Sequence, residues 1–331
     1  MRSCISVIIP CYNLEKTVGR MLDSVLKQTY PNIELIVVND GSTDNSEAVI
    51  LSYEERFKNS DRAFKYVKQD NSGLGAAINA GLREITGEYF CWGDADDYYE
   101  PTSFEERAAV LESRPELAVV TSNAYIRGAD KLNETRLLAK NNAINNDPEQ
   151  FLYHLNGDSI FCPGCHMVRT SMFREVYPDM QIYPARRGQN WQLLLPLYFK
   201  YKRYFLNKPL YNYIVYPNSM SKDRDCQEDK IRRFNEHEKI LNEVLKHIAK
   251  TENVDITEYS RFLDDKYAKL RMEVYLRYGD YESFKQEYIK KQHNVGIDKY
   301  DRIALLRYKS RLFRSTYRIA YRIAHGGYQK R

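Results

Sequence analysis

The stretch Glu88-Tyr-Phe-Cys-Trp-Gly-Asp-Ala-Asp-Asp-Tyr-Tyr-Glu-Pro101 decides how the rest of the chain is interpreted. Its apolar run, Tyr89–Trp92, is typical of a buried strand. A glycine follows, and then come three carboxylates, Asp94, Asp96 and Asp97. Carboxylates this close together repel one another, and a hard divalent cation such as Mg²⁺ or Mn²⁺ is their usual partner. The alternative is a solvated acidic turn in which an aspartate caps a helix.

Three further apolar runs lie upstream. Ile5–Ile9, Ile33–Val38 and Phe64–Val67 are predicted to be buried strands. Leu14–Leu26 and Ala76–Ile85, which lie between strands, have the apolar spacing of helices. This alternation predicts an α/β fold with a mostly parallel sheet and helices on both faces. In such sheets a ligand is expected beyond the carboxyl ends of the strands.

Polar side chains follow the ends of these four predicted strands. They are found in Pro10-Cys-Tyr-Asn13, Asn39-Asp40, Asp70-Asn71 and the acidic triplet. Because parallel strands end at the same edge of a sheet, we expect these side chains to lie close together. Tyr12 can stack on a base, Asp40 can accept a hydrogen bond from a base N–H, and a metal ion can neutralise a diphosphate. This set of groups predicts a nucleotide-diphosphate pocket.

Three motifs carry a resemblance to a known family. They are Ile5-Ser-Val-Ile-Ile-Pro-Cys-Tyr-Asn13, Ile36-Val-Val-Asn-Asp-Gly-Ser-Thr-Asp44 and Gly93-Asp-Ala-Asp-Asp97. In this order and spacing they resemble the inverting family 2 glycosyltransferases, which have the Rossmann-like GT-A fold. The resemblance implies an enzyme that moves a sugar from a nucleotide-diphosphate donor, a UDP-sugar, to a glycan or lipid-linked acceptor in cell-surface polysaccharide synthesis. It also implies inversion of the anomeric centre.

The resemblance assigns roles to residues of this chain. The nucleotide-sugar-binding residues that it implies are Pro10, Tyr12, Asp40, Asn71, Asp94 and Asp97. The metal ligands that it implies are Asp94 and Asp96, with Mn²⁺ or Mg²⁺ as the cofactor.

The middle of the chain departs from the family pattern at one motif. Ile160–Val168 is predicted to be a strand that returns to the site, and the polar Arg127–Asn146 is predicted to be a loop or flap. Gly188-Gln-Asn-Trp191 stands where the family often has Gly-Glu-Asp-Trp, whose aspartate is the general base. Asn190 occupies that position here, and an amide cannot take a proton near neutral pH. Trp191 is expected either to stack on the acceptor sugar or to lie in the core.

Three interpretations of the missing base stay open. In the first, Asn190 orients the acceptor while Asp179 or Asp158 takes the proton. In the second, His166 is the base, although a lone histidine is more often structural. In the third, the chain is catalytically weak or inactive; an inactive chain would be a non-catalytic nucleotide- or glycan-binding protein of the same fold.

The last third of the chain is predicted to be helical, so we expect a glycosyltransferase domain over residues 1–220 and a helical region over residues 221–331. A final helix is predicted over Lys299–His325. Five arginines in this region are spaced four, three, four and four residues apart, which places them on one helical face. They are Arg307, Arg311, Arg314, Arg318 and Arg322. A basic amphipathic helix is typical of binding to an anionic membrane surface, and the alternative is a solvated helix packed on the acidic main body.

Composition narrows the function further. The 331 residues carry a net charge of +5, and no apolar run is long enough to span a membrane. With no signal peptide expected and six scattered cysteines, we expect a cytoplasmic protein, at the inner face of the membrane if the basic tail binds there. No nucleic-acid partner is expected, because nothing besides the basic tail favours one. A dinucleotide-dependent oxidoreductase is set aside, since the Gly73-x-Gly75 loop follows the third strand and has Ile78 where a third glycine is needed.

Overall fold

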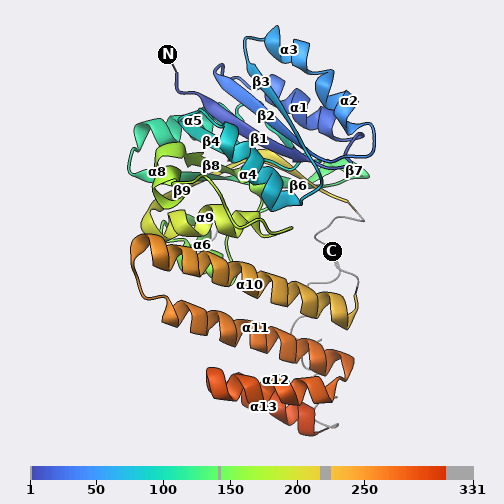
Figure 1. Cartoon of the computed structure of the whole chain (residues 1–331), viewed down its shortest axis with the longest axis vertical. Coiled ribbons are helices and arrows are strands. Elements are labelled where there is room, and N and C mark those ends of the chain that lie inside the picture. The colour runs from blue at the N-terminus through green and yellow to red at the C-terminus, as the bar shows by residue number, and fades with distance from the viewer. Residues whose placement is uncertain (1, 141–142, 217–224, 311–331) are drawn as a thin grey trace. The chain divides into compact units, whose positions relative to one another are not determined.

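The computed structural model describes residues 2–140, 143–216 and 225–310 (Figure 1). The chain divides into two compact units, Met1–Ser219 and Met220–Arg331. The described residues of the first unit form an α/β structure on a nine-stranded sheet, and those of the second are helical. The predicted fold class, a mostly parallel α/β sheet with a helical C-terminal region, is confirmed.

The sheet of the first unit has the spatial order β3-β2-β1-β4-β8-β6-β9-β5, and β7 pairs with β6. Its first four strands are parallel, whereas β8 runs antiparallel between β4 and β6. Farther along, β9 is parallel to β6 and antiparallel to β5. The strands are β1 Ile5–Cys11, β2 Ile33–Asp40, β3 Ala63–Gln69, β4 Tyr89–Trp92, β5 Tyr98–Tyr99, β6 Leu117–Gly128, β7 Lys131–Leu137, β8 His166–Arg169 and β9 Lys202–Val215.

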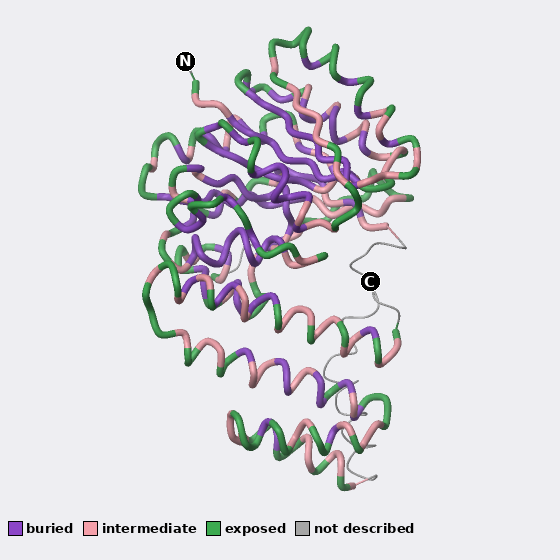
Figure 2. The backbone as a smooth tube through the Cα atoms, viewed as in Figure 1, coloured by how far each residue is buried: buried purple, intermediate pink, exposed green. Residues whose placement is uncertain are grey.

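Helices cover both faces of this sheet, whose strands are mostly buried (Figure 2). Ile5, Val7 and Ile9 of β1 share one core with apolar residues of α1 and α5. Ile8 points to the other face and meets α4 so closely that a Cβ at Gly81 would lie 2.4 Å from its Cγ2. The helices of this unit are α1 Val18–Leu26, α2 Ser46–Leu51, α3 Glu54–Lys58, α4 Leu74–Glu84, α5 Ser103–Ser113, α6 Ala143–Asn146, α7 Phe151–Asn156, α8 Thr170–Val176 and α9 Gln189–Lys200.

The second unit contains four described helices, and buried ion pairs join them. They are α10 Gln227–Glu252, α11 Thr257–Tyr278, α12 Tyr281–Asn294 and α13 Lys299–Lys309. Arg271 of α11 donates to Glu238 of α10 and, at 2.9 Å, to Glu287 of α12. Its side chain is 7 % exposed, so the three helices share one desolvated charge cluster. None of the described helices is both long enough and apolar enough to cross a membrane.

A second charge cluster, buried at Lys291 and Asp301, fixes α13. The ammonium group of Lys291, whose side chain is 1 % exposed, contacts Asp301 at 2.6 Å and Asp265 at 2.8 Å. Lys269 contacts Asp265 and Asp298, at 2.7 and 2.6 Å. Asp265, Asp298 and Asp301 form a carboxylate group close enough to hold a metal ion, but the two lysines already neutralise most of its charge.

Three predicted elements differ from the structure. The predicted flap Arg127–Asn146 contains β7, an exposed strand that extends the sheet beside β6. Within the predicted strand Ile160–Val168, a short 3₁₀ turn at Pro163–Cys165 precedes β8, because proline removes a backbone donor. The predicted helix Lys299–His325 ends at Lys309, after which Ser310 has an extended backbone, with φ −124° and ψ 117°.

Candidate functional site

The four parallel strands end together at one edge of the sheet. Cys11, the last residue of β1, pairs with Asn39 of β2. Asp40, the last residue of β2, pairs with Gln69, the last of β3. β4 pairs with the other side of β1 and ends at Trp92, directly before the acidic triplet. We call this edge and the loops that leave it the rim.

The loop after β1 is fixed to the turn after β2. Asn13 has a left-handed backbone, with φ 53°, and its side-chain oxygen accepts a hydrogen bond from the Thr43 amide at 2.8 Å. Its own amide donates to the Ser42 hydroxyl at 3.0 Å. Tyr12 consequently stands at the surface, 47 % exposed, whereas Pro10 is buried within β1. The ring of Tyr12 is free to stack on a planar group at the rim.

Asp40 is buried and anchors the loop after β3. Its carboxylate accepts hydrogen bonds from the side chain of Gln69 at 2.7 Å and from the amides of Ser72 and Gly73, both at 2.9 Å. A carboxylate has about four acceptor positions, so one remains for a ligand. Asn71 is exposed in the same loop. Its backbone nitrogen lies so close to Gly41 that a Cβ at that glycine would be only 2.6 Å away, so the loops after β2 and β3 are in contact.

The acidic triplet is brought together by contacts with β9. Asp94, Asp96 and Asp97 each offer a carboxylate oxygen within 4.8 Å of the others. The Asp94 amide donates to the Tyr211 hydroxyl at 3.2 Å, and the Ile214 amide donates to Oδ1 of Asp97 at 2.7 Å. β9 lies more than a hundred residues away in the sequence, so these contacts cannot be predicted from the motif itself.

Burial and mutual repulsion make this acidic group costly to ionise. Burial, helped by Asp96, raises the pKa of Asp94 to about 7. The pKa of Asp97 is raised well above its usual range by burial and then by its two acidic neighbours. Burial also raises the pKa of Asp96, against the favourable charge of Arg20. Arg20 itself donates to the Asp96 carbonyl and to the Tyr216 hydroxyl, the latter at 3.0 Å.

The acidic group fits a hard divalent cation. Oδ2 of Asp97 is buried and has no hydrogen-bond partner among the described residues, although a buried carboxylate oxygen without a partner is destabilising. A cation among the three carboxylates would supply that partner and reverse the shifts in pKa. Asp96, with Asp94 or Asp97, would hold Mg²⁺ or Mn²⁺ here.

Asn190 has a structural role at the end of β4. Its side-chain oxygen accepts a hydrogen bond from the Trp92 indole at 2.9 Å, and its side-chain nitrogen donates to the Phe161 carbonyl. Trp191 is 9 % exposed, donates to the His154 carbonyl at 3.2 Å and packs edge-on against Phe161. Of the two expectations for Trp191, its burial and these contacts favour a place in the core.

The other candidates for the base are not members of the acidic group. His166 is fully buried, stacks on Trp92 and pairs with the Thr121 hydroxyl at 3.1 Å, so an acceptor sugar cannot reach it. Asp179 is exposed in the turn between Tyr177 and Met180, outside the acidic group. Asp158 is exposed just after α7, where it accepts a hydrogen bond from Asn156.

Of the five arginines on the predicted basic face, Arg307 is described, and it is paired within the helical unit. Its side chain is 11 % exposed and donates to Glu273 of α11 at 2.9 Å, so Arg307 belongs to the packing of the helical unit. The other four arginines lie outside the described residues. They are Arg311, Arg314, Arg318 and Arg322.

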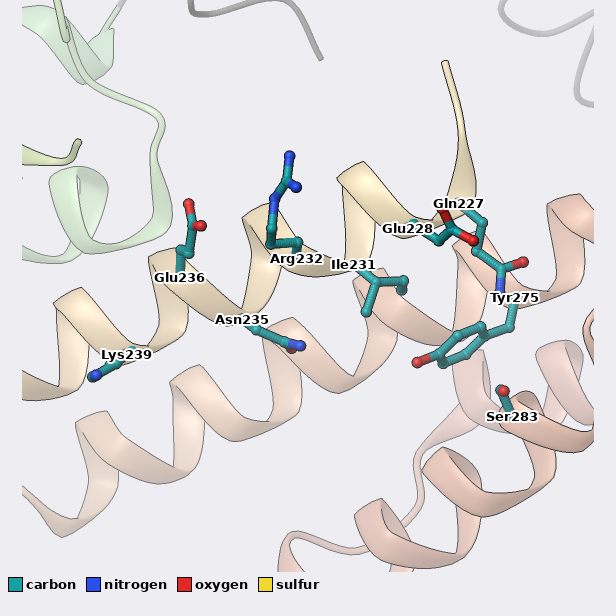
Figure 3. Close-up of a pocket in the computed structure, with 9 residues that line it drawn as sticks. All are labelled: Gln227, Glu228, Ile231, Arg232, Asn235, Glu236, Lys239, Tyr275 and Ser283. Carbon is teal, nitrogen blue, oxygen red and sulfur yellow. The ribbon is translucent and has the colours of Figure 1, made fainter. Parts of the chain in front are cut away.

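The helical unit contains a separate cavity of about 600 Å³ (Figure 3). Its charged lining combines Glu228 and Glu236 with Arg232 and Lys239, beside the ring of Tyr275. Balanced charges of this kind do not match a strongly anionic ligand such as a nucleotide diphosphate.

Two curated relatives match part of this chain. Glycosyltransferase GlyA of Streptococcus pneumoniae is 30 % identical over 243 residues, which cover 66 % of this chain and 31 % of GlyA. An uncharacterized glycosyltransferase of Rickettsia conorii is 33 % identical over 187 residues, 54 % of this chain and 30 % of that protein. The chain thus matches less than a third of the length of either relative.

Two solved structures share the fold. TarS 1–349 of Staphylococcus aureus in complex with UDP has a TM-score of 0.56 at 18 % identity, over 89 % of this chain and 93 % of that one. A mannosyltransferase of Pyrobaculum calidifontis in complex with GDP-Man and Mn²⁺ has a TM-score of 0.53 at 15 % identity, over 100 % and 89 %. The family model "Glycosyl transferase family 2" matches residues 6–177, more than half of the chain, and the chain therefore belongs to glycosyl transferase family 2.

Proposed function

We propose that this protein is a metal-dependent glycosyltransferase that moves a sugar from a nucleotide-diphosphate donor, a UDP-sugar, to a glycan or lipid-linked acceptor. The observation that carries the proposal is the rim itself. An exposed aromatic ring at Tyr12, a spare acceptor position on Asp40 and a group of three carboxylates lie at the ends of neighbouring strands. Their order, from Asp40 on β2 through Tyr12 after β1 to the carboxylates after β4, suits a ligand with its base at one end and a metal-bound diphosphate at the other.

In this proposal the chain's own residues bind and orient the donor. Tyr12 stacks on the base, and Asp40, held by the loop that it anchors, accepts a base N–H. Pro10 shapes the floor of the base site, and Asn71 offers an amide at its border. When bound at the acidic group, the metal ion supplies charge neutralisation for the leaving diphosphate. An acceptor hydroxyl would attack the anomeric carbon from the face opposite the diphosphate, and the bond to the diphosphate would break as the new bond forms. The hydroxyl proton would pass to a base, for which we propose Asp179, and the anomeric centre would be inverted.

The related structures support the donor class and the metal. TarS structures contain UDP or UDP-GlcNAc, and the mannosyltransferase structure contains GDP-Man with Mn²⁺. We propose that the acceptor belongs to a cell-surface polysaccharide and that residues 1–220 form the catalytic domain. We also propose that the basic residues after position 310 hold the protein at the inner face of a membrane.

The direct test is release of UDP from a panel of UDP-sugars, with and without acceptor, in Mn²⁺ or in EDTA. We expect UDP release in Mn²⁺ and none in EDTA. The rate of UDP release should fall at least about a hundredfold in Asp96→Ala, because a metal supplies several kcal/mol of charge stabilisation. Asp130→Asn, at an exposed aspartate before β7, is the matched control and should keep full turnover. Full activity of Asp96→Ala would exclude the metal role.

A second function is favoured by one observation, the amide at position 190. Asn190 uses both ends of its amide in structural hydrogen bonds, and a non-catalytic nucleotide- or glycan-binding protein needs no base there. Calorimetry that finds UDP binding, combined with no turnover on a broad acceptor panel, would favour this function over the enzyme.

A further inference from the structure

One arginine beside the rim has a fixed backbone and a side chain with no partner among the described residues. The segment before α9 is bound to α4 at two levels. The Asn79 side chain donates to the Ile182 carbonyl and accepts from the Ile182 amide, both at 2.8 Å. Gly75, in the first turn of α4, donates its amide to the Ala185 carbonyl at 2.9 Å. The backbone next to Arg186 is therefore held against the rim end of α4.

Arg186 lies directly against the loop that Asp40 anchors. Its Cγ is 3.1 Å from the position that a Cβ at Gly73 would take, and the Gly73 amide donates to Asp40. From Arg186 the chain continues to α9, where Asn190 binds the indole of Trp92 at the end of β4. The segment that carries Arg186 thus runs along the rim, from the loop after β3 to the end of β4.

The guanidinium of Arg186 is not committed elsewhere in the described part of the chain. The side chain is exposed, and it makes no hydrogen bond or ion pair with another described residue. Arg20, a second cation near the rim, is already bound to the Asp96 carbonyl and the Tyr216 hydroxyl. A long cationic side chain whose backbone is fixed and whose guanidinium is exposed is suited to bind an anion that arrives from solution.

The charge of the rim calls for such a cation. Asp40 and the three carboxylates of the acidic group all lie there, and a nucleotide diphosphate adds further negative charge. One divalent ion balances only part of this sum. A diphosphate that spans from the base site near Asp40 to the acidic group would pass along the segment that carries Arg186.

We propose that Arg186 binds the diphosphate of the donor, and so is a positioning residue for the leaving group. The proposal rests on the proposed function. The guanidinium of Arg186 can donate two parallel hydrogen bonds to phosphate oxygens, a geometry that a lysine cannot reproduce. The arginine would reach the diphosphate from the side of α4 and α9. Its positive charge would complement the metal ion held by the carboxylates.

The test is calorimetric titration of the full chain with UDP in the presence of Mn²⁺, repeated with Arg186→Ala and Arg186→Lys. We expect Arg186→Ala to weaken UDP binding by about 10- to 100-fold, as for the loss of hydrogen bonds to a charged group, and Arg186→Lys to restore part of it. Binding of uridine, which has no phosphate and is followed by NMR, should stay the same in all three proteins. Arg83→Ala, at the exposed far end of α4, is the matched control and should bind UDP normally.

The outcomes separate this inference from the proposed function. If Arg186→Ala binds UDP as the unchanged chain does, while Asp96→Ala loses it, the role of Arg186 is wrong and the metal site stands. Equal losses of uridine and UDP in Arg186→Ala would also overturn the inference, because they would mean a damaged loop. If the unchanged chain binds no UDP, both proposals fail.

Discussion

Asn190→Asp separates the structural interpretation of this position from the catalytic one. If the site needs an acid at position 190, the substitution supplies it and turnover should rise. In the structure, however, the side-chain nitrogen donates to the Phe161 carbonyl and the oxygen accepts from the Trp92 indole. An aspartate keeps the second interaction and loses the first.

The expected cost follows from this loss. Asn190 is 8 % exposed, so the new carboxylate would face the Phe161 carbonyl with little access to water. Leaving a buried polar group without its partner costs about 1–3 kcal/mol. Burial beside a carbonyl would raise the pKa of the new acid in the folded chain. The penalty should therefore be smallest below the unfolded pKa of about 4, and it should grow as the pH rises toward the folded value.

Urea unfolding measured by tryptophan fluorescence is the assay, since both tryptophans of the chain, Trp92 and Trp191, contact this site. Asn133→Asp makes the same chemical change on exposed β7 and should shift stability by less than about 0.5 kcal/mol. UDP-sugar turnover is measured on the same samples and should not increase. An Asn190→Asp protein that is as stable as the original and turns over faster would refute the structural assignment.

Three other predictions concern the base site, the helical unit and the pH dependence of folding. Tyr12→Ala should weaken UDP binding by about 1–3 kcal/mol in calorimetry, as for loss of base stacking, while Tyr12→Phe should not; equal affinities for all three proteins would exclude stacking. Lys291→Met should cost about 3–5 kcal/mol because it leaves the buried carboxylate of Asp301 without its cation, whereas Lys285→Met on the exposed side of α12 should cost little. Circular dichroism during urea unfolding measures that difference, and matching curves for the two variants would contradict it. Burial lowers the pKa of His154 to about 3, so its contribution to stability is complete above the unfolded pKa of about 6.5 and falls by about 1.4 kcal/mol per pH unit below it. The difference in unfolding free energy between the original chain and His154→Gln should change with this slope from pH 6 to 5, because the other titrating groups are common to both proteins; a difference that does not change with pH would argue against a buried neutral imidazole.

The rim could be predicted from the sequence because its residues follow buried strands directly. Tyr12 comes immediately after β1, and Asp40 is the last residue of β2, so the parallel register alone brings their loops together. The acidic triplet follows β4 in the same way. Local apolar runs fix the strands, and the topology then fixes the edge.

Residues that complete the site from distant elements could not be predicted in this way. Tyr211 and the Ile214 amide position the acidic group from β9, and no pattern near them indicates a ligand. β7 is not predicted because all of its residues are exposed, so it has no apolar alternation. The sequence leaves Trp191 ambiguous because its burial depends on Phe161 and His154, which reach it only in the folded chain.

The measurement that tests the central claim most directly is a crystal structure with UDP and Mn²⁺. We expect one Mn²⁺ ion coordinated by Asp96 and by Asp94 or Asp97, at about the 2.1 Å typical of small divalent ions, with the uracil on Tyr12 and its N–H directed to Asp40. UDP bound in the cavity of the helical unit, or at the rim with no ion on any of the three carboxylates, would contradict it.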